Sequence, residues 1–358
     1  MVRKVAERIL LLLLLFLCSC VKDRPNPPEI NVPLPGSKGM LILNEGAYGM
    51  NNAELTWATN FEDQWMQRVF FAKNQKPLGD VAQHVCIIDG HYWISLNNSG
   101  AISIIDTATF EEVKRINGVS FPRYILPVNE HTVYVSTMYS DRIILIDRQL
   151  REKKGELKLG VQNPEHMLKV GPAVYICPWD TASAVVCKVD ASTHTLSKTI
   201  TLAGRAAHDV VQDALGRLWV LSGNKYAGKP SVLSCIDPSG DSVLFALPFP
   251  AAADPMRLQT NLQGDTLLYI QVDYFGTASN NGLFRMGMHE KTLAAGPWIP
   301  APANTYFWGF GIRPLDGHVL ISDPKGFTQQ SNVYEYGADG KYLRTYSAGI
   351  GASQFLFP

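Results

Sequence analysis

One short phrase, an apolar run that ends in Asp and passes into a polar turn, returns along this chain at nearly regular intervals. Four copies end in Asp, and two fainter copies have Gly at the same point: Asp106, Asp147, Asp190, Asp237, Gly287 and Gly337. Successive copies lie 41 to 50 residues apart. A period of this length, with strand signals between the copies, is typical of β-propeller blades and argues against a helical solenoid.

Each repeat divides into four short strands. In one repeat they are VAQHVCIID, HYWISLN, AISIIDT and EEVKRIN, and in the next PRYILPVN, TVYVSTM, RIILIDR and EKKGELKL. β-branched and aromatic residues fill the strands, and Gly, Asn and Asp punctuate the gaps. The recurring Asp is expected to close the third strand and to bond backbone amides of the following turn, which makes it part of the scaffold and not a metal ligand.

The number of blades follows from the two ends of the chain. Before the marked repeats lies a unit with only three strand signals, MLILNEG, AELTWATN and QRVFFA (Gln67–Ala72). A fourth strand is available in GASQFLFP (Gly351–Pro358). We predict an all-β, seven-bladed propeller of four-stranded blades, closed by pairing of the C-terminal strand into the first blade, because closure removes open sheet edges. Six or eight blades remain alternatives.

The N-terminus has the pattern of an export signal. Arg3, Lys4 and Arg8 precede the apolar run Ile9–Leu17, which is too short to span a membrane. Ser19 before Cys20 resembles the lipobox of bacterial lipoproteins. We predict a signal peptide at residues 1–19, a lipidated Cys20 with a proline-rich tether over 20–38, and the propeller over 39–358. An ordinary secretory signal is the alternative.

Charge and cysteine content restrict the partners. Lys+Arg and Asp+Glu both number 32, so the chain has no net charge and no basic field that would attract nucleic acid. The cysteines beyond Cys18 and Cys20 of the signal region, namely Cys86, Cys177, Cys187 and Cys235, follow no CxxC or zinc-ligand spacing. Buried free thiols are expected, with a cross-strand disulfide between Cys177 and Cys187 as the alternative.

Two sets of residues are expected on one face of the propeller. The links between blades hold residues that would ring the central axis: Gln83, His84, Arg123, Glu165, His166, His208, Asp209, Met256, Arg257, Trp308 and Gln354. The loops between second and third strands hold mostly aromatic residues: Tyr48, Asn97 with Asn98, Tyr139, Trp179, Tyr226, Tyr274 with Phe275, and Phe327. Aromatic side chains with polar tips suit a large, partly apolar ligand, so these loops predict a binding face. The alternative is that the rings seal the blade tops.

Catalysis and metal binding are less favoured by the sequence. His84, His166 and His208 recur at one expected register, where three imidazoles could bind a metal, but hydrogen-bonded channel residues are the favoured interpretation. No GxSxG, HExxH, Walker or dinucleotide motif occurs. We therefore predict a protein that is not an enzyme and needs no cofactor. A lyase or hydrolase that uses Glu45, Glu165, His208 or Asp209 is an alternative.

The segment NEGAYGMNNAELTW (Asn44–Trp57) carries a resemblance to a known group. It resembles the opening of Bacteroidota surface lipoproteins with a seven-bladed, YncE-like, DUF5074-type propeller. Within that group the chain is most similar to the BtuG-type lipoproteins that capture vitamin B12. The resemblance covers the signal, the tether and the ring from Met40 to Pro358.

The resemblance implies an outer-membrane, lipid-anchored and surface-exposed protein. It would bind cobamides such as vitamin B12 as ligand, not as cofactor, and pass them to a TonB-dependent cobalamin transporter. A glycan- or peptide-binding propeller is the alternative. From the residues themselves we predict the following ligand contacts: Tyr48, Asn97, Tyr139, Trp179, Tyr226, Tyr274, Phe275, Phe327, His84, Arg123, Glu165, His208 and Trp308.

Overall fold

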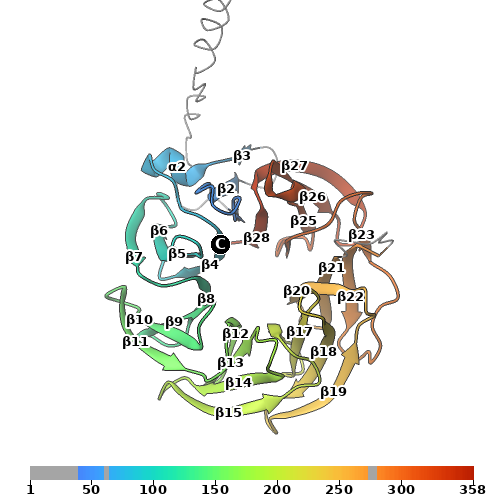
Figure 1. The fold of residues 1–358 in the computed structure, drawn as a ribbon. Coiled ribbons are helices and arrows are strands. Elements are labelled where there is room, and N and C mark those ends of the chain that lie inside the picture. The colour runs from blue at the N-terminus through green and yellow to red at the C-terminus, as the bar shows by residue number, and fades with distance from the viewer. Residues whose placement is uncertain (1–38, 60–63, 273–279) are drawn as a thin grey trace, which may run out of the picture. The chain divides into compact units, whose positions relative to one another are not determined.

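Seven antiparallel sheets of four strands each, arranged in a ring, make up the propeller (Figure 1). The computed structural model describes residues 39–59, 64–272 and 280–358, all within a compact unit that spans Val32–Pro358. The predicted fold class and blade number are therefore confirmed. Among the described residues, no helix has the length and apolar character needed to cross a membrane. The predicted signal, Cys20, the tether, Tyr274 and Phe275 lie outside the described residues.

Blades 2 to 4 follow the predicted strands closely, each running from the channel outward. Blade 2 contains β4 (Ala82–Ile88), β5 (His91–Leu96), β6 (Ala101–Asp106) and β7 (Glu112–Asn117). Blade 3 contains β8 (Pro122–Pro127), β9 (Thr132–Thr137), β10 (Arg142–Asp147) and β11 (Glu152–Lys158). Blade 4 contains β12 (Pro164–Val170), β13 (Ala173–Pro178), β14 (Val185–Asp190) and β15 (Thr195–Thr201).

Blades 5 to 7 repeat the same order with longer connections. Blade 5 contains β16 (Ala207–Gln212), β17 (Leu218–Asn224), β18 (Lys229–Asp237) and β19 (Ser242–Pro248). Blade 6 contains β20 (Asp254–Thr260), β21 (Thr266–Val272), β22 (Gly282–Gly287) and β23 (Ile299–Pro300). Blade 7 contains β24 (Phe310–Ile312), β25 (Val319–Asp323), the 3-10 turn η1 (Lys325–Phe327), β26 (Gln330–Tyr336) and β27 (Tyr342–Ile350).

Blade 1 closes the ring with strands from both ends of the chain. Its order is β28 (Ala352–Leu356), β1 (Gly39–Asn44), β2 (Glu54–Thr59) and β3 (Gln64–Met66), and Leu41 pairs with Leu356 across β1 and β28. The predicted closure by the C-terminal strand is confirmed. β28 also packs tightly on blade 7, since a Cβ atom on Gly309 would lie 2.0 Å from the Ser353 carbonyl oxygen. Only glycine permits that approach.

One strand prediction in blade 1 was wrong. QRVFFA, over residues 67–72, is not the outer strand of this blade; the helix α2 (Val69–Asn74) occupies most of it, and β3 ends at Met66. Tertiary contacts fix the helix: the buried Glu54 carboxylate accepts the Phe71 amide at 3.0 Å, and Asn74 Nδ2 donates to the Phe110 carbonyl at 2.9 Å. These contacts override the local β-propensity of the phrase.

The recurring Asp has the predicted structural role. Asp106, Asp147, Asp190 and Asp237 each end the third strand of a blade. Asp106 Oδ1, for example, accepts the amides of Ala108 and Thr109, both at 2.9 Å. These bonds hold the hairpin to the outer strand.

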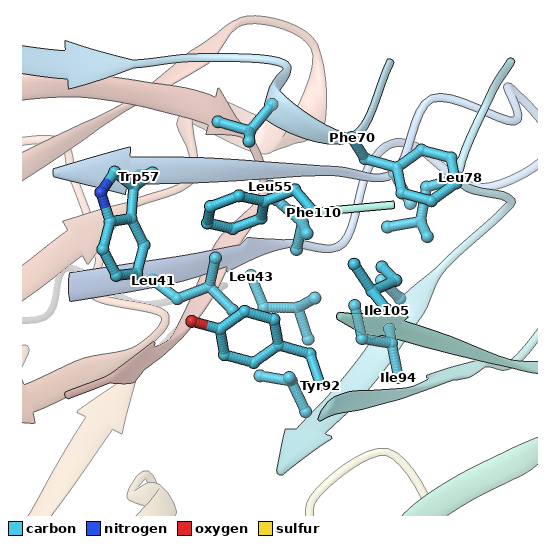
Figure 2. Close-up of a cluster of buried hydrophobic side chains, with 14 of the residues drawn as sticks. Leu41, Leu43, Leu55, Trp57, Phe70, Leu78, Tyr92, Ile94, Ile105 and Phe110 are labelled. Carbon is cyan, nitrogen blue, oxygen red and sulfur yellow. The ribbon is translucent and has the colours of Figure 1, made fainter. Parts of the chain in front are cut away.

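The hydrophobic core lies between the blades. Each of seven clusters of buried apolar side chains joins one pair of neighbouring sheets. Figure 2 shows the cluster between blades 1 and 2, in which Trp57 of β2 lies near Phe110, with 5.4 Å between ring centroids. Because these contacts occupy the sheet faces, the side chains at the inner edge of each blade remain available to line the channel.

The cysteines of the described residues are free. Cys187 pairs with Ile176 across β13 and β14, so Cys177 and Cys187 point to opposite faces of the blade. They pack into different clusters accordingly. Free buried thiols, the favoured prediction, are confirmed for Cys177, Cys187 and Cys235, whereas Cys86 is free but only partly buried, and the alternative disulfide is wrong.

Candidate site at the mouth of the central channel

A β-bulge at the start of the innermost strands produces two layers of side chains in the channel. Among the described innermost strands, the pairing register shifts at six such points: between Ala82 and His84, Pro122 and Ile125, Pro164 and Met167, Ala207 and Asp209, Met256 and Gln259, and Ala352 and Gln354. A bulge sets two residues against one partner, so consecutive side chains can face the same side. The upper layer contains Gln83, Arg123, Glu165, His208 and Met256, and the lower layer contains His84, Tyr124, His166, Asp209, Arg257 and Gln354.

This register corrects the expected equivalence of three histidines. His84 and His166 do occupy corresponding positions, but the residue aligned with them in blade 5 is Asp209, and His208 belongs to the upper layer with Arg123 and Glu165. The sequence prediction was wrong by one residue because a bulge cannot be seen in the alternation pattern. Within the described residues, no cluster of three or more His, Cys, Asp or Glu side chains is arranged to hold a metal.

In the upper layer, an ion pair joins blades 3 and 4. Arg123 Nε lies 2.8 Å from Glu165 Oε2, and its Nη2 also donates to Glu165 Oε1. Arg123 Nη1 donates to Gln83 Oε1 at 2.5 Å, which extends the contact to blade 2. Burial opposes the charge on Arg123, but the adjacent Glu165 carboxylate outweighs burial and raises the guanidinium pKa above its usual value.

In the lower layer, the Asp209 carboxylate joins three groups. Its Oδ1 lies 3.2 Å from His166 Nδ1, and its Oδ2 lies 3.3 Å from both His208 Nδ1 and the Leu258 amide nitrogen of blade 6. Burial alone would raise the pKa of this carboxyl group, but the hydrogen bonds from the two imidazoles hold it well below its usual range. Asp209 therefore stays ionised at neutral pH.

A row of three packed rings, one tyrosine between two histidines, lies beside Asp209. The Tyr124 ring lies between His84 and His166, with centroid distances of 4.9 and 4.8 Å. His84 Nδ1 accepts the Ile125 amide at 3.3 Å, just as Gln354 Oε1 accepts the Val85 amide at 2.9 Å one blade earlier. Burial, with smaller contributions from the charges of His166 and Arg257, lowers the pKa of His84 to about 3. The imidazole is therefore neutral and acts as an acceptor.

A second ion pair, between Arg257 of blade 6 and Glu45 next to blade 1, holds the other side of the ring. Arg257 Nη2 donates to Glu45 Oε1 at 3.0 Å, and Trp308 Nε1 donates to the same oxygen at 2.9 Å. The Arg257 guanidinium also lies over the Trp308 ring, 5.3 Å from its centroid. Phe327 supports Trp308 from the side in an edge-to-face contact, at 5.1 Å between centroids.

Above these layers lies a cavity of about 340 Å³. Its walls include Trp179, Tyr226 and Trp308, and its floor includes the charged pairs of the channel. Six of the predicted ligand residues line it: Arg123, Glu165, Trp179, His208, Tyr226 and Trp308. A separate cavity of about 230 Å³ lies deeper in the channel, and Gln83, Tyr124, Asp209 and Arg257 border both.

The other predicted residues lie elsewhere. His84 lines the deeper cavity, and Phe327 packs behind Trp308. Asn97 is buried, and its Nδ2 donates to the Pro122 carbonyl at 3.1 Å. Tyr48 and Tyr139 are 79% and 70% exposed and do not line the cavity.

Sequence reasoning missed Tyr124 as a site residue and considered Glu45 only as a catalytic alternative. Tyr124 directly follows Arg123, so a prediction that allowed for the bulge would have included both. Glu45 follows β1, and its role depends on the closure that brings blades 1 and 7 together. No local pattern marks that contact.

The fold and this cavity define the class of the protein: a seven-bladed propeller with an aromatic-walled cavity at the channel mouth. Residues 38–244 match the family described as domain of unknown function DUF5074, more than half of the chain. The chain belongs to this family. No protein of curated function matches its sequence.

Solved structures show the same fold at low sequence identity. A quinonprotein alcohol dehydrogenase-like protein from Bacteroides thetaiotaomicron has a TM-score of 0.65 at 14% identity, covering 90% of this chain and 78% of that one. A periplasmic gluconolactonase from Pseudomonas aeruginosa has a TM-score of 0.65 at 11% identity, covering 89% and 99%. Hydrazine synthase from Kuenenia stuttgartiensis has a TM-score of 0.59 at 11% identity, covering 75% and 87%. These likenesses concern the fold alone.

Proposed function

We propose that this protein captures a cobamide, of the vitamin B12 type, at the aromatic-walled cavity and that it binds this ligand without transforming it. The observation that carries the proposal is the division of the cavity into aromatic walls and a floor of charges already bonded to each other. Arg123 pairs with Glu165, Arg257 with Glu45, and Asp209 with two imidazoles. A catalytic site would leave an acid, base or nucleophile directed at substrate.

The size and chemistry of the cavity favour this kind of ligand. A volume of about 340 Å³ is at the small end for binding sites of organic molecules. A cobamide is larger, so one edge of the corrin would enter while the rest lies across the ring faces of Trp179, Tyr226 and Trp308. Broad aromatic surfaces supply most of the binding energy in such contacts, and a nearly neutral ligand needs no free charge.

Titration of cyanocobalamin into the purified chain by calorimetry tests the proposal. We expect one-to-one binding. Trp179→Ala should weaken it at least ten-fold, because Trp179 forms the cavity wall, whereas Tyr139→Ala on the exposed rim should weaken it less. Tyr342→Ala, on the outer strand β27, serves as the control. An absence of binding at tens of micromolar would exclude vitamin capture, and a glycan panel would then follow.

The proposal includes an outer-membrane anchor at Cys20 and transfer of ligand to a TonB-dependent transporter. The chain enters the propeller at Gly39, and β1 then runs toward Glu45 at the cavity. At ~3.3 Å per residue, six residues separate these points by roughly 20 Å. Gly39 therefore lies toward the face opposite the cavity.

Two measurements address the anchor and its side of the membrane. Metabolic labelling with a palmitate analogue should mark the wild type and leave Cys20→Ala unlabelled. Protease treatment of intact cells should degrade a surface-exposed protein. Label on Cys20→Ala, or full protection in intact cells, would contradict this part of the proposal.

A further inference from the structure

Two uncharged donors at the cavity floor are not used by the protein itself. Gln83 is only 8% exposed; its Oε1 accepts from Arg123, while among the described residues its Nε2 has no hydrogen-bond partner. The Tyr124 hydroxyl likewise bonds no described residue. Both side chains border the upper cavity and the deeper one. Because the Gln83 amide nitrogen keeps some exposure at the cavity, a ligand or water there can complete its bonding.

The surroundings hold both groups in place. The Tyr124 ring is fixed between His84 and His166, so its hydroxyl cannot swing away from the channel. Arg123 fixes the Gln83 amide by its oxygen, which directs the NH2 group elsewhere. Burial, followed by the charges of Asp209 and Glu165, raises the pKa of Tyr124, so the hydroxyl keeps its proton and can donate.

The charges around the floor disfavour an anion. Four acidic side chains line the upper cavity, namely Glu45, Glu165, Asp209 and Asp254, against three cations, Arg123, Lys225 and Arg257, which leaves one formal negative charge. Both arginines are already bonded to carboxylates. A carboxylate ligand would have to break one of these pairs and face the remaining acids, at a cost that a neutral group avoids.

We propose that the cavity floor is a subsite for a neutral hydrogen-bond acceptor, a carboxamide or hydroxyl group, that receives hydrogen bonds from Gln83 Nε2 and Tyr124 Oη, and that it rejects carboxylates. This subsite rests on the cavity of the proposed function and names the part of the ligand that enters it. For a cobamide, a carboxamide-bearing edge of the corrin would enter, and the phosphodiester would remain outside.

Benzamide and benzoate form a matched pair of probes, because they differ in the acceptor group and fit a cavity of this size. With the full chain in detergent, titration followed by ligand-observed NMR should give benzamide an affinity at least ten-fold higher than that of benzoate. Tyr124→Phe keeps the ring stack and removes the hydroxyl. Gln83→Glu keeps the acceptor for Arg123 and removes the donor. Each should weaken benzamide by about three- to ten-fold, the usual effect of one neutral hydrogen bond.

The controls are Tyr342→Phe and Gln149→Glu, at exposed positions outside the cavity. Circular dichroism of each variant checks that the fold persists. Equal or tighter binding of benzoate, no binding of benzamide, or unchanged affinity in both cavity variants would overturn the subsite. The two proposals can fail separately. A preference for benzamide without any binding of cyanocobalamin would contradict cobamide capture and leave the subsite standing. Unchanged cyanocobalamin affinity in Gln83→Glu and Tyr124→Phe would contradict the subsite and leave cobamide capture standing.

Discussion

Neighbouring residues of the same inner strands differ in what they bond. In the lower layer, Gln354, His84 and Asp209 accept backbone amides of the next blade. In the upper layer, the Arg123 side chain bonds Glu165 and Gln83 among the described residues, and Arg123 and Glu165 face the aromatic-walled cavity. Where an innermost strand starts with a bulge, one residue thus serves ring cohesion and the residue before it faces the cavity, while Tyr124 of the lower layer reaches the cavity as well.

This difference sets an order of expected effects on stability. A side chain that bonds backbone amides across a blade junction cannot be replaced by water without loosening that junction. A side chain at the cavity has solvent beside it when no ligand is bound. We therefore expect the lower layer to dominate the free energy of unfolding and the upper layer to dominate binding.

The largest effect is expected for Asp209→Ala. The change leaves His166, His208 and the Leu258 amide without their shared acceptor in a buried setting. A loss of about 3–5 kcal/mol in the free energy of unfolding is expected, as for other broken buried charge clusters. Urea unfolding followed by tryptophan fluorescence measures it. A loss below about 1 kcal/mol would show that the junction does not depend on this carboxylate.

A smaller loss is expected for Glu165→Gln in the upper layer. Arg123 keeps Gln83 as an acceptor and can reach water through the cavity, so its charge is not stranded. We expect a loss of about 2 kcal/mol in the same urea experiment. A larger loss of stability than that of Asp209→Ala would contradict the expectation that the lower layer contributes more to the free energy of unfolding.

Acidification should lower the free energy of unfolding through His84, a residue of the lower layer. Its pKa of about 3 in the folded protein lies below the ordinary 6.5, so the unfolded chain binds the additional proton between these values. Stability should therefore be unaffected by His84 above about pH 6.5 and fall as the pH drops below it, by at most about 1.4 kcal/mol per pH unit.

The variant His84→Gln isolates this contribution. Gln354 accepts the Val85 amide at the corresponding position, so glutamine can replace the acceptor without titrating. The difference between the wild-type and variant curves cancels other groups, including Glu54, whose pKa burial raises to about 7. Parallel curves from pH 7 to 4.5 would mean that His84 is not held neutral in the fold.

Sequence patterns were sufficient for the ring but not for the site. Spacing of the Asp phrase and the C-terminal strand predicted seven blades and their closure, because these depend on local turns and on strand count. Six predicted site residues line one cavity, because strand count and turn position also fix which loops and strand ends lie at the channel mouth. The layer assignment of His208 and the helix α2 could not be predicted, since a bulge and the Glu54–Phe71 bond depend on contacts distant in sequence.

The smallest effect on stability is expected when the upper ion pair is removed entirely. In Arg123→Met/Glu165→Met, neither charge is left without its partner, and replacing a buried pair with apolar side chains is often nearly neutral. We expect unfolding free energy within about 1 kcal/mol of the wild type, less change than for Glu165→Gln alone. Ligand binding should nevertheless fall, because Gln83 loses the arginine that orients its amide. If the free energy of unfolding fell together with ligand affinity, the Arg123–Glu165 pair would stabilise the propeller as the lower layer does, contrary to this expectation.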